Sequence, residues 1–130
     1  MKNIILISRY LMAIILLVFG ANKFFHFMPM PNMSSEGANF MGALVKAGYF
    51  MPILGVIMIL TGLSLVFRKH TALMLVIMAP ITVNIILFHL FLDPGNIMVA
   101  AVLTIVHVIM LWAYKDCYKG MLSCCGKGKC

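Results

Sequence analysis

Four long apolar runs occupy most of this chain of 130 residues and constrain its fold more than any motif does. The runs cover residues 4–27, 49–67, 71–92 and 97–114. A helix of about 20 residues, rising about 1.5 Å per residue, crosses the ~30 Å hydrocarbon core of a bilayer. Strands of a membrane barrel are only about ten residues long, so these runs do not suit them. The sequence therefore predicts an all-α membrane protein whose four transmembrane helices form a bundle.

The composition also favours a bilayer as the surrounding medium. Hydrophobic residues make up 64% of the chain and charged residues 10%, against about 45–50% and about 25% in globular domains. The formal net charge of +7 would suit nucleic acid, but the Lys and Arg residues stand at the ends of the apolar runs, without interleaved aromatic residues. We therefore expect lipid phosphates, and not nucleic acid, as their partners.

The basic residues predict an orientation. If four helices cross, only Lys23 and Lys46 fall on one side, and the other side carries Lys2, Arg9, Arg68, Lys69, Lys115, Lys119, Lys127 and Lys129. This asymmetry predicts a multi-pass membrane protein with both termini in the cytoplasm. Bulky aromatic residues after Lys23 argue against cleavage of the first run as a secretory signal. We divide the chain into a transmembrane domain, residues 1–114, and a basic, cysteine-containing cytoplasmic tail, residues 115–130.

The segment between the first two runs predicts a short additional helix. Pro29 and Pro31 end the first helix, because proline lacks the backbone donor that a helix needs. Ser34 or Ser35 is a suitable N-cap for a helix over about residues 35–47. This helix is too short and too polar to cross, so we expect it to lie at the membrane interface.

Glycine and proline mark the predicted packing surfaces. Gly48, Gly55 and Gly62 recur every seven residues, which places them on one side of the second span, and Gly20 lies in the first span. Small residues let the backbones of two membrane helices approach closely. Pro80 should kink the third span.

Two cations lie within the first run. Arg9 and Lys23 share a line along one helix face with Ala13, Leu16 and Gly20, at about 100° per residue. A line that carries two cations is expected to face the bundle. Two interpretations stay open, since the cations either extend to opposite interfaces or anchor an anionic head group, substrate or partner.

A polar cluster is predicted at the outer end of the bundle. It would join Lys23, His26, His89 and Asp93, with Glu36 from the loop. Ionisable residues in a membrane are functional candidates, and this set would relay protons or hold a quinone head group. An ordinary polar interface network is the alternative.

Two further polar residues lie deeper in the membrane. His107, one turn after Thr104, is expected to be a neutral imidazole that forms hydrogen bonds between helices. Asn84 lies one turn beyond Pro80, at a depth where irregular backbone is tolerated only against protein or a wet cavity.

The sequence predicts no catalytic residues, no metal site and no intrinsic cofactor. The chain has only three carboxylates, and its cysteines form no C-x-x-C motif. Thiol exchange, metal capture and lipid attachment are weak alternatives for the cysteines. A flexible tail with cysteines of no structural role is favoured for Cys117, Cys124, Cys125 and Cys130.

Several pieces together resemble the DoxX family of small four-helix membrane proteins. They are RYLMAIILLVFGANKFF from Arg9, FMGAL from Phe40, GYFMP from Gly48, Gly62, and Pro80 before Asn84. The resemblance covers about residues 4–114, leaves out the cysteine tail and supplies no catalytic residues. It implies an auxiliary, redox-linked subunit of an inner-membrane complex, not an enzyme on its own, that binds quinone or lipid near the outer leaflet.

Two other functions stay open. Pro80 and Asn84 suit an oligomeric transporter of small molecules or ions, although no inverted repeat is evident. The face of Gly48, Gly55 and Gly62 suits a scaffold or assembly factor that recognises the helix of a membrane partner. Partners are therefore expected to be the bilayer and either other membrane proteins or further copies of this chain.

Overall fold

The computed structural model describes residues 1–124, and this part of the chain is helical without any strand. The elements in order are α1 (Lys2–Phe25), α2 (Ser35–Lys46), α3 (Phe50–Phe67), α4 (Thr71–Phe91), the 3-10 turn η1 (Pro94–Asn96), α5 (Ile97–Ala113) and α6 (Lys115–Cys124). The helices α1, α3 and α4, and α5 together with η1, are long and apolar enough to cross a bilayer. The predicted all-α membrane fold with four spans is confirmed, and α2 is the short helix expected after the first span.

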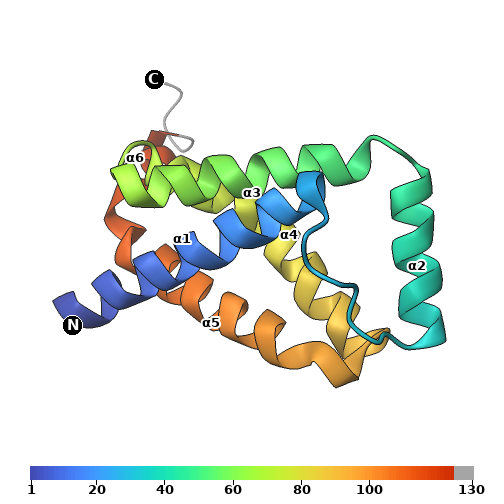
Figure 1. Ribbon diagram of the computed structural model, residues 1–130. Helices are drawn as coiled ribbons and strands as arrows, with labels where there is room; N and C mark the ends of the chain where they lie inside the picture. The colour runs from blue at the N-terminus through green and yellow to red at the C-terminus, as the bar shows by residue number, and fades with distance from the viewer. Residues whose placement is uncertain (125–130) are drawn as a thin grey trace.

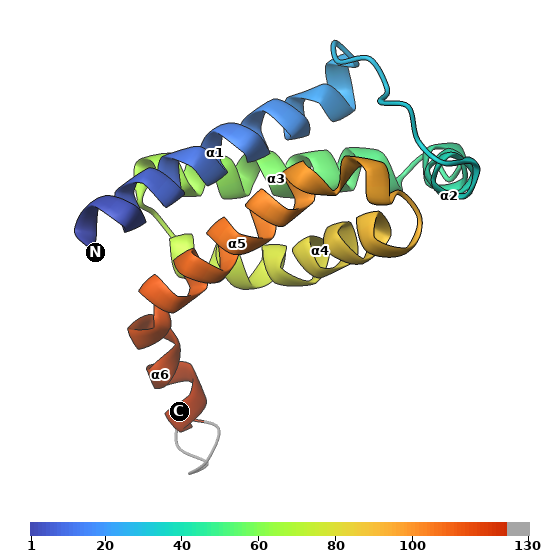
Figure 2. The same cartoon turned by 90° about the horizontal axis from the view of Figure 1, so that it is seen from below.

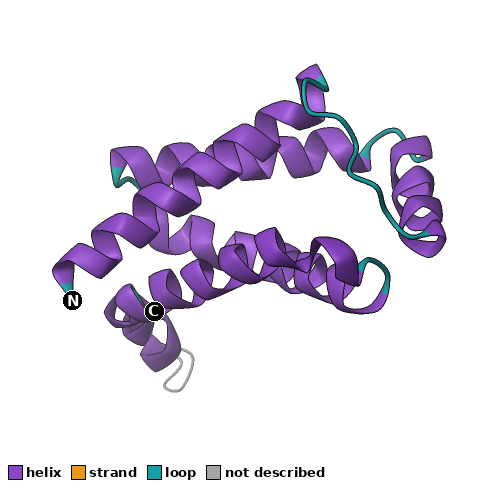
Figure 3. Ribbon diagram, turned by 60° about the horizontal axis from the view of Figure 1, so that its bottom comes forward, coloured by secondary structure: helices purple, strands orange, loops and turns teal. Residues whose placement is uncertain are grey.

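The four long helices form a ring in which each packs against two others. The helix α1 lies along α3 and also contacts α5, while α4 packs between α3 and α5. Figure 3 shows the result as two layers, with α1 and α3 in one and α4 and α5 in the other. Every long helix therefore has one face toward the centre and one face left for lipid.

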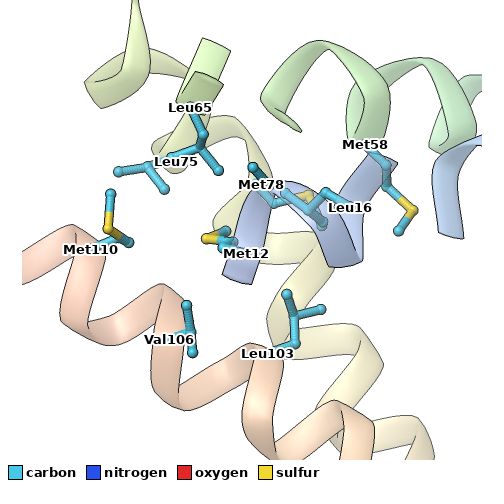
Figure 4. Packing of buried hydrophobic residues seen from close by; sticks show 10 residues of the cluster. Met12, Leu16, Met58, Leu65, Leu75, Met78, Leu103, Val106 and Met110 are labelled. Atoms are coloured by element: carbon cyan, nitrogen blue, oxygen red, sulfur yellow. The ribbon is translucent and has the colours of Figure 1, made fainter. Parts of the chain in front are cut away.

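The centre of the ring is filled by leucine and methionine side chains (Figure 4). Met12 of α1 and Met110 of α5 are both fully buried and belong to the same cluster. Unbranched methionine adapts to irregular gaps, which suits helices that cross at different angles. Many apolar side chains outside this cluster are exposed in the isolated chain, as expected of helices whose outer faces contact hydrocarbon.

The closest helix contact joins α1 and α3 in antiparallel orientation. A Cβ atom added to Gly55 would stand 2.7 Å from Phe24 Cε2 and 3.2 Å from the Gly20 carbonyl oxygen. One added to Gly62 would stand 2.7 Å from Leu17 Cγ. These glycines therefore serve the packing of α1 on α3 within the chain, so the face is not free for the helix of a partner.

Gly48 does not belong to this packing face, and its predicted place there is wrong. It precedes α3 in the turn from α2, and nothing lies within 4 Å of the position of its Cβ. Its φ of +79° is a backbone conformation that glycine adopts without a steric cost. Although Gly48 keeps the seven-residue spacing, it does not share the helix face of Gly55 and Gly62, because α3 begins only after this turn.

The short helix α2 lies across one end of the bundle, roughly perpendicular to α3 (Figure 1). Ser34 is its N-cap, and the Ser34 hydroxyl oxygen accepts a hydrogen bond of 3.1 Å from the Gly37 N–H. Phe40 of α2 packs on Phe88 of α4 with 5.7 Å between ring centroids. This arrangement would place α2 along the membrane interface if the long helices cross the bilayer.

Residues 115–124 form the helix α6 and not the flexible segment that we expected. Figure 2 shows α6 extending away from the bundle, and the Tyr118 hydroxyl donates to the Ala72 carbonyl oxygen at 3.1 Å. An exposed ion pair joins Lys119 and Asp116 at 2.7 Å, and the hydrogen bond and charge of Lys119 lower the pKa of Asp116. Such pairs three residues apart support a helix, and the spacing of Asp116 and Lys119 was the signal in the sequence. Cys117 is exposed on α6, and Cys125 and Cys130 lie outside the described residues.

Candidate functional site

Three ionisable side chains are buried in the described part of the chain, and they mark three separate places in the fold. Arg9 is 5% exposed, Asp93 is 3% exposed and His107 is 2% exposed. Burial of an ionisable group costs free energy unless partners satisfy it. The partners of each residue therefore decide what it does.

Arg9 has no hydrogen-bond or ionic partner in the described part of the chain. Its Nε and Nη2 atoms are buried without a hydrogen bond. The only ion pair within residues 1–120 joins Lys119 to Asp116, so no carboxylate in this part of the chain pairs with Arg9. The guanidinium carbon lies 4.9 Å from the centroid of the Tyr10 ring. Among the described residues, this ring contact is the one favourable interaction of the charge.

The magnitudes show that the ring contact leaves Arg9 uncompensated. A cation over an aromatic ring gains about 0.5–2 kcal/mol. Removing a charged group from water costs several kcal/mol even after the surrounding protein relaxes. Arg9 thus provides a positive charge and unused donors at a place where an anion with acceptor oxygens would be strongly stabilised.

Lys23 lies on the same face of α1 as Arg9, at the opposite end. The residues between them on this face, Ala13, Leu16 and Gly20, are buried, and Lys23 itself is partly buried. The Lys23 Cβ would stand 3.0 Å from a Cβ added to Gly55. The line of residues therefore faces the bundle, and Lys23 passes beside the close contact of α1 with α3.

Asp93 holds the loop before α2 against the turn between α4 and η1. Asp93 Oδ1 accepts a hydrogen bond of 3.4 Å from the Ser34 N–H, and Oδ2 accepts one of 2.8 Å from Asn96 Nδ2. The Ser34 hydroxyl donates to the Leu92 carbonyl oxygen, and Asn96 Nδ2 also donates to the Asn32 carbonyl oxygen at 3.1 Å. Both carboxylate oxygens are engaged, so this site fixes structure.

The remaining members of the predicted outer cluster are not brought to Asp93. His26 and Glu36 are exposed, and His89 Nδ1 lies 2.9 Å from the carbonyl oxygen of Ile85 in its own helix. In the described residues no ion pair joins Asp93 to Lys23 or to a histidine. The packing of α1 on α3 explains this, because it carries the end of α1 away from the turn between α4 and α5, as Figures 1 and 2 both show.

His107 joins α5 to α4 deep in the bundle, as an interhelical hydrogen-bonding residue. Its Nδ1 lies 2.7 Å from Thr82 Oγ1 and its Nε2 lies 3.0 Å from the carbonyl oxygen of Leu75. A carbonyl oxygen only accepts, so Nε2 carries a hydrogen and donates it to Leu75. Nδ1 pairs with the Thr82 hydroxyl, which also lies 3.2 Å from the Met78 carbonyl oxygen. Both ring nitrogens are therefore satisfied between the two helices.

The sequence interpretation missed Thr82 as the partner of His107. Thr104, the residue it named, donates to the Ala100 carbonyl oxygen of its own helix at 2.7 Å. Thr82 follows Leu75 by seven residues and so lies on the same face of α4. That spacing was the available signal for a polar residue facing the core.

Asn84 and Pro80 are both exposed on the outer side of α4. The Asn84 side chain makes no hydrogen bond in the described part of the chain. Neither residue is therefore enclosed within the bundle of this chain.

Residues 1–120, whose side chains are described, contain no group of three His, Cys, Asp or Glu residues that could hold a metal ion. A cavity of about 400 Å³ lies at the end of the bundle where α4 begins, and its lining includes Arg68, His70, Cys117 and Tyr118. This is also the end at which α1 begins, since α1 and α3 are antiparallel. Arg68 and His70 therefore stand at the same end as Arg9.

The chain matches no family model, no curated protein and no solved structure. The interpretation of the site therefore depends on its geometry. Of the residues described above, Arg9 is the buried ionisable group whose requirement for a partner is unmet.

Proposed function

We propose that this chain is a membrane-embedded auxiliary subunit whose bundle binds the anionic head group of a membrane lipid through Arg9. The observation that carries the proposal is the buried guanidinium with two unpartnered nitrogen atoms. A guanidinium forms paired, charge-assisted hydrogen bonds with phosphate oxygens. A phosphate would supply both the charge and the acceptors that Arg9 lacks.

The depth of Arg9 suits a lipid from the leaflet at the beginning of α1. Arg9 follows Lys2 by seven residues, which is about 10 Å along the helix axis. Lys2, Arg68 and Lys69 are exposed at the same end of the bundle and would concentrate anionic lipid there, at about 1 kcal/mol for each cation. This location replaces the outer leaflet that the sequence led us to expect.

The wider proposal is that the chain belongs to a redox-linked complex of the bacterial inner membrane, and it rests on the resemblance to the DoxX family. In such a complex quinone is a competing ligand. A quinone carbonyl can accept hydrogen bonds from Arg9, but a neutral molecule does not compensate the buried charge. Phosphate is therefore the preferred ligand.

The proposal is tested by the lipids that the protein retains. Wild-type protein, Arg9→Gln and the control Lys2→Gln are purified in mild detergent, and bound lipids and quinones are quantified by native mass spectrometry. Lys2→Gln removes one charge at the same end of the bundle without touching the buried site. We expect Arg9→Gln to retain anionic phospholipid about 10- to 100-fold less, because charge-assisted hydrogen bonds contribute about 1.5–3 kcal/mol. Lys2→Gln should lower retention by no more than about 5-fold, since one surface cation contributes about 1 kcal/mol.

Thermal unfolding provides a second readout that does not depend on purification. Vesicles that contain phosphatidylglycerol should stabilise the wild-type protein more than Arg9→Gln, since a ligand of the native state raises stability by mass action. Equal lipid retention and equal stabilisation for the two proteins would contradict the proposal. Loss of quinone alone from Arg9→Gln would instead assign the site to the competing ligand.

A further inference from the structure

The outer face of α4 presents a regular stripe of exposed side chains. Six positions, separated by four, three, four, three and four residues, fall within about 80° of one another at 100° per residue. They are Leu73, Ile77, Pro80, Asn84, Leu87 and Phe91, and all six are exposed in the isolated chain. No other helix of the described chain covers this stripe.

The spacing and residue types are those of a parallel helix pair. With Ile77 and Asn84 at a positions, Leu87 occupies the d position of the heptad that begins at Asn84, and Leu73 occupies the d position of the heptad before Ile77. A β-branched residue at a, with leucine at d, favours a parallel pair of helices, and one asparagine at an a position fixes the register of the pair. Pro80 takes the remaining d position.

Asn84 is the residue that requires a partner. It lies three residues beyond the midpoint of α4, about 4.5 Å along the axis, and its side chain makes no hydrogen bond in the described part of the chain. Other polar side chains near the middle of the four helices are bonded within the chain, and these are Thr61, Thr82, Thr104 and His107. A carboxamide that faces hydrocarbon leaves its donors and its acceptor unsatisfied.

A second copy of the chain satisfies this requirement. Two copies inserted in the same direction are related by a two-fold axis along the membrane normal, which sets their α4 helices parallel and each residue near its equivalent. A carboxamide both donates and accepts, so the two Asn84 side chains complement each other. We propose that the chain forms a parallel homodimer through the stripe of α4, with reciprocal hydrogen bonds between the two Asn84 side chains.

The contact geometry can be tested by disulfide formation in lipid vesicles. In a background with all four cysteines replaced by serine, one cysteine is introduced either at Leu87, on the stripe, or at Val83, which is exposed but lies off it. The dimer predicts rapid oxidative cross-linking for Leu87→Cys and little for Val83→Cys. Equal cross-linking at the two positions would rule out this interface.

The role of the amide is tested by the dimer equilibrium at low protein-to-lipid ratio, followed by energy transfer between labelled copies. Hydrogen bonds between membrane helices contribute about 0.6–2 kcal/mol, so Asn84→Leu should weaken association roughly 3- to 30-fold. The control Val83→Leu should leave association unchanged. Leucine at an exposed position in lipid is compatible with folding, so unchanged association in Asn84→Leu would overturn the proposal.

Discussion

A single histidine connects two helices that are also neighbours in sequence. His107 of α5 reaches both a side chain and a backbone carbonyl of α4, at 2.7 Å from Thr82 Oγ1 and 3.0 Å from the Leu75 oxygen. The surrounding side chains Leu75, Met78 and Met110 are fully buried. In this setting a hydrogen bond fixes the register of α5 on α4, because apolar packing alone permits the helices to slide.

We predict that His107→Leu lowers the free energy of unfolding by about 1–3 kcal/mol. The substitution removes two hydrogen bonds between helices, each contributing about 0.6–1.7 kcal/mol in a membrane protein, and keeps an apolar side chain of similar size. The measurement is unfolding in mixed micelles with increasing sodium dodecyl sulfate. Thr104→Val is the control, since Thr104 bonds only within its own helix, and it should change the free energy by less than about 0.5 kcal/mol. Equal stability of His107→Leu and wild type would show that packing alone sets the register.

At the scale of elements, the contact between α1 and α3 determines where the ends of α1 lie. Gly20 and Gly55 bring the two backbones together near one end, and Gly62 accommodates Leu17 nearer the other. A side chain at Gly55 would meet an aromatic ring and backbone at once, so the neighbours have little room to move. The close contact therefore depends on glycine at this position.

We predict that Gly55→Ala lowers the free energy of unfolding by about 1–3 kcal/mol, the usual cost of overpacking. The matched control is Gly42→Ala in α2, where nothing lies within 4 Å of the added Cβ. Alanine is the better helix former by about 0.5–1 kcal/mol, so the control should be neutral or stabilising. Both variants can be compared by the same micelle titration. A stable Gly55→Ala would mean that α1 shifts on α3 at little cost.

The elements were largely predictable from the sequence, and the site was not. Long apolar runs specify membrane helices directly, and helix periodicity placed Arg9 and Gly20 on a buried face. The partners of Asp93 could not be deduced, because Ser34 is 59 residues away and meets it only after α2 has packed on α4. The predicted outer cluster failed for the same reason, since residues at one membrane depth come together only if the helix directions allow it.

At the scale of the whole molecule, the charges give the bundle two different ends. The end at which α1 and α4 begin carries Lys2, Arg68 and Lys69, while the opposite end carries α2 and the network around Asp93. Basic residues near spans are retained in the cytoplasm. We therefore expect both the beginning of α1 and α6 to face the cytoplasm.

This orientation is tested by labelling with a thiol reagent that does not cross the membrane. Cys117 on α6 should react only after the cytoplasmic side has been opened. A cysteine introduced at Asn39, which is exposed on α2, should react in intact cells when the native cysteines are replaced. Reaction of both positions from the same side would be incompatible with four crossings.

The packing of α1 also has a consequence for the timing of membrane insertion. The first helix leaves the ribosome long before its neighbours exist, because α3 and α5 supply the surfaces that enclose it. Arg9 and Met110 are separated by about 100 residues, which take about 5–20 s to synthesise at about 5–20 residues per second. For that period the cation of α1 must be accommodated by the insertion machinery or by lipid head groups, and the N-terminal helix waits longest of the four for its full set of neighbours.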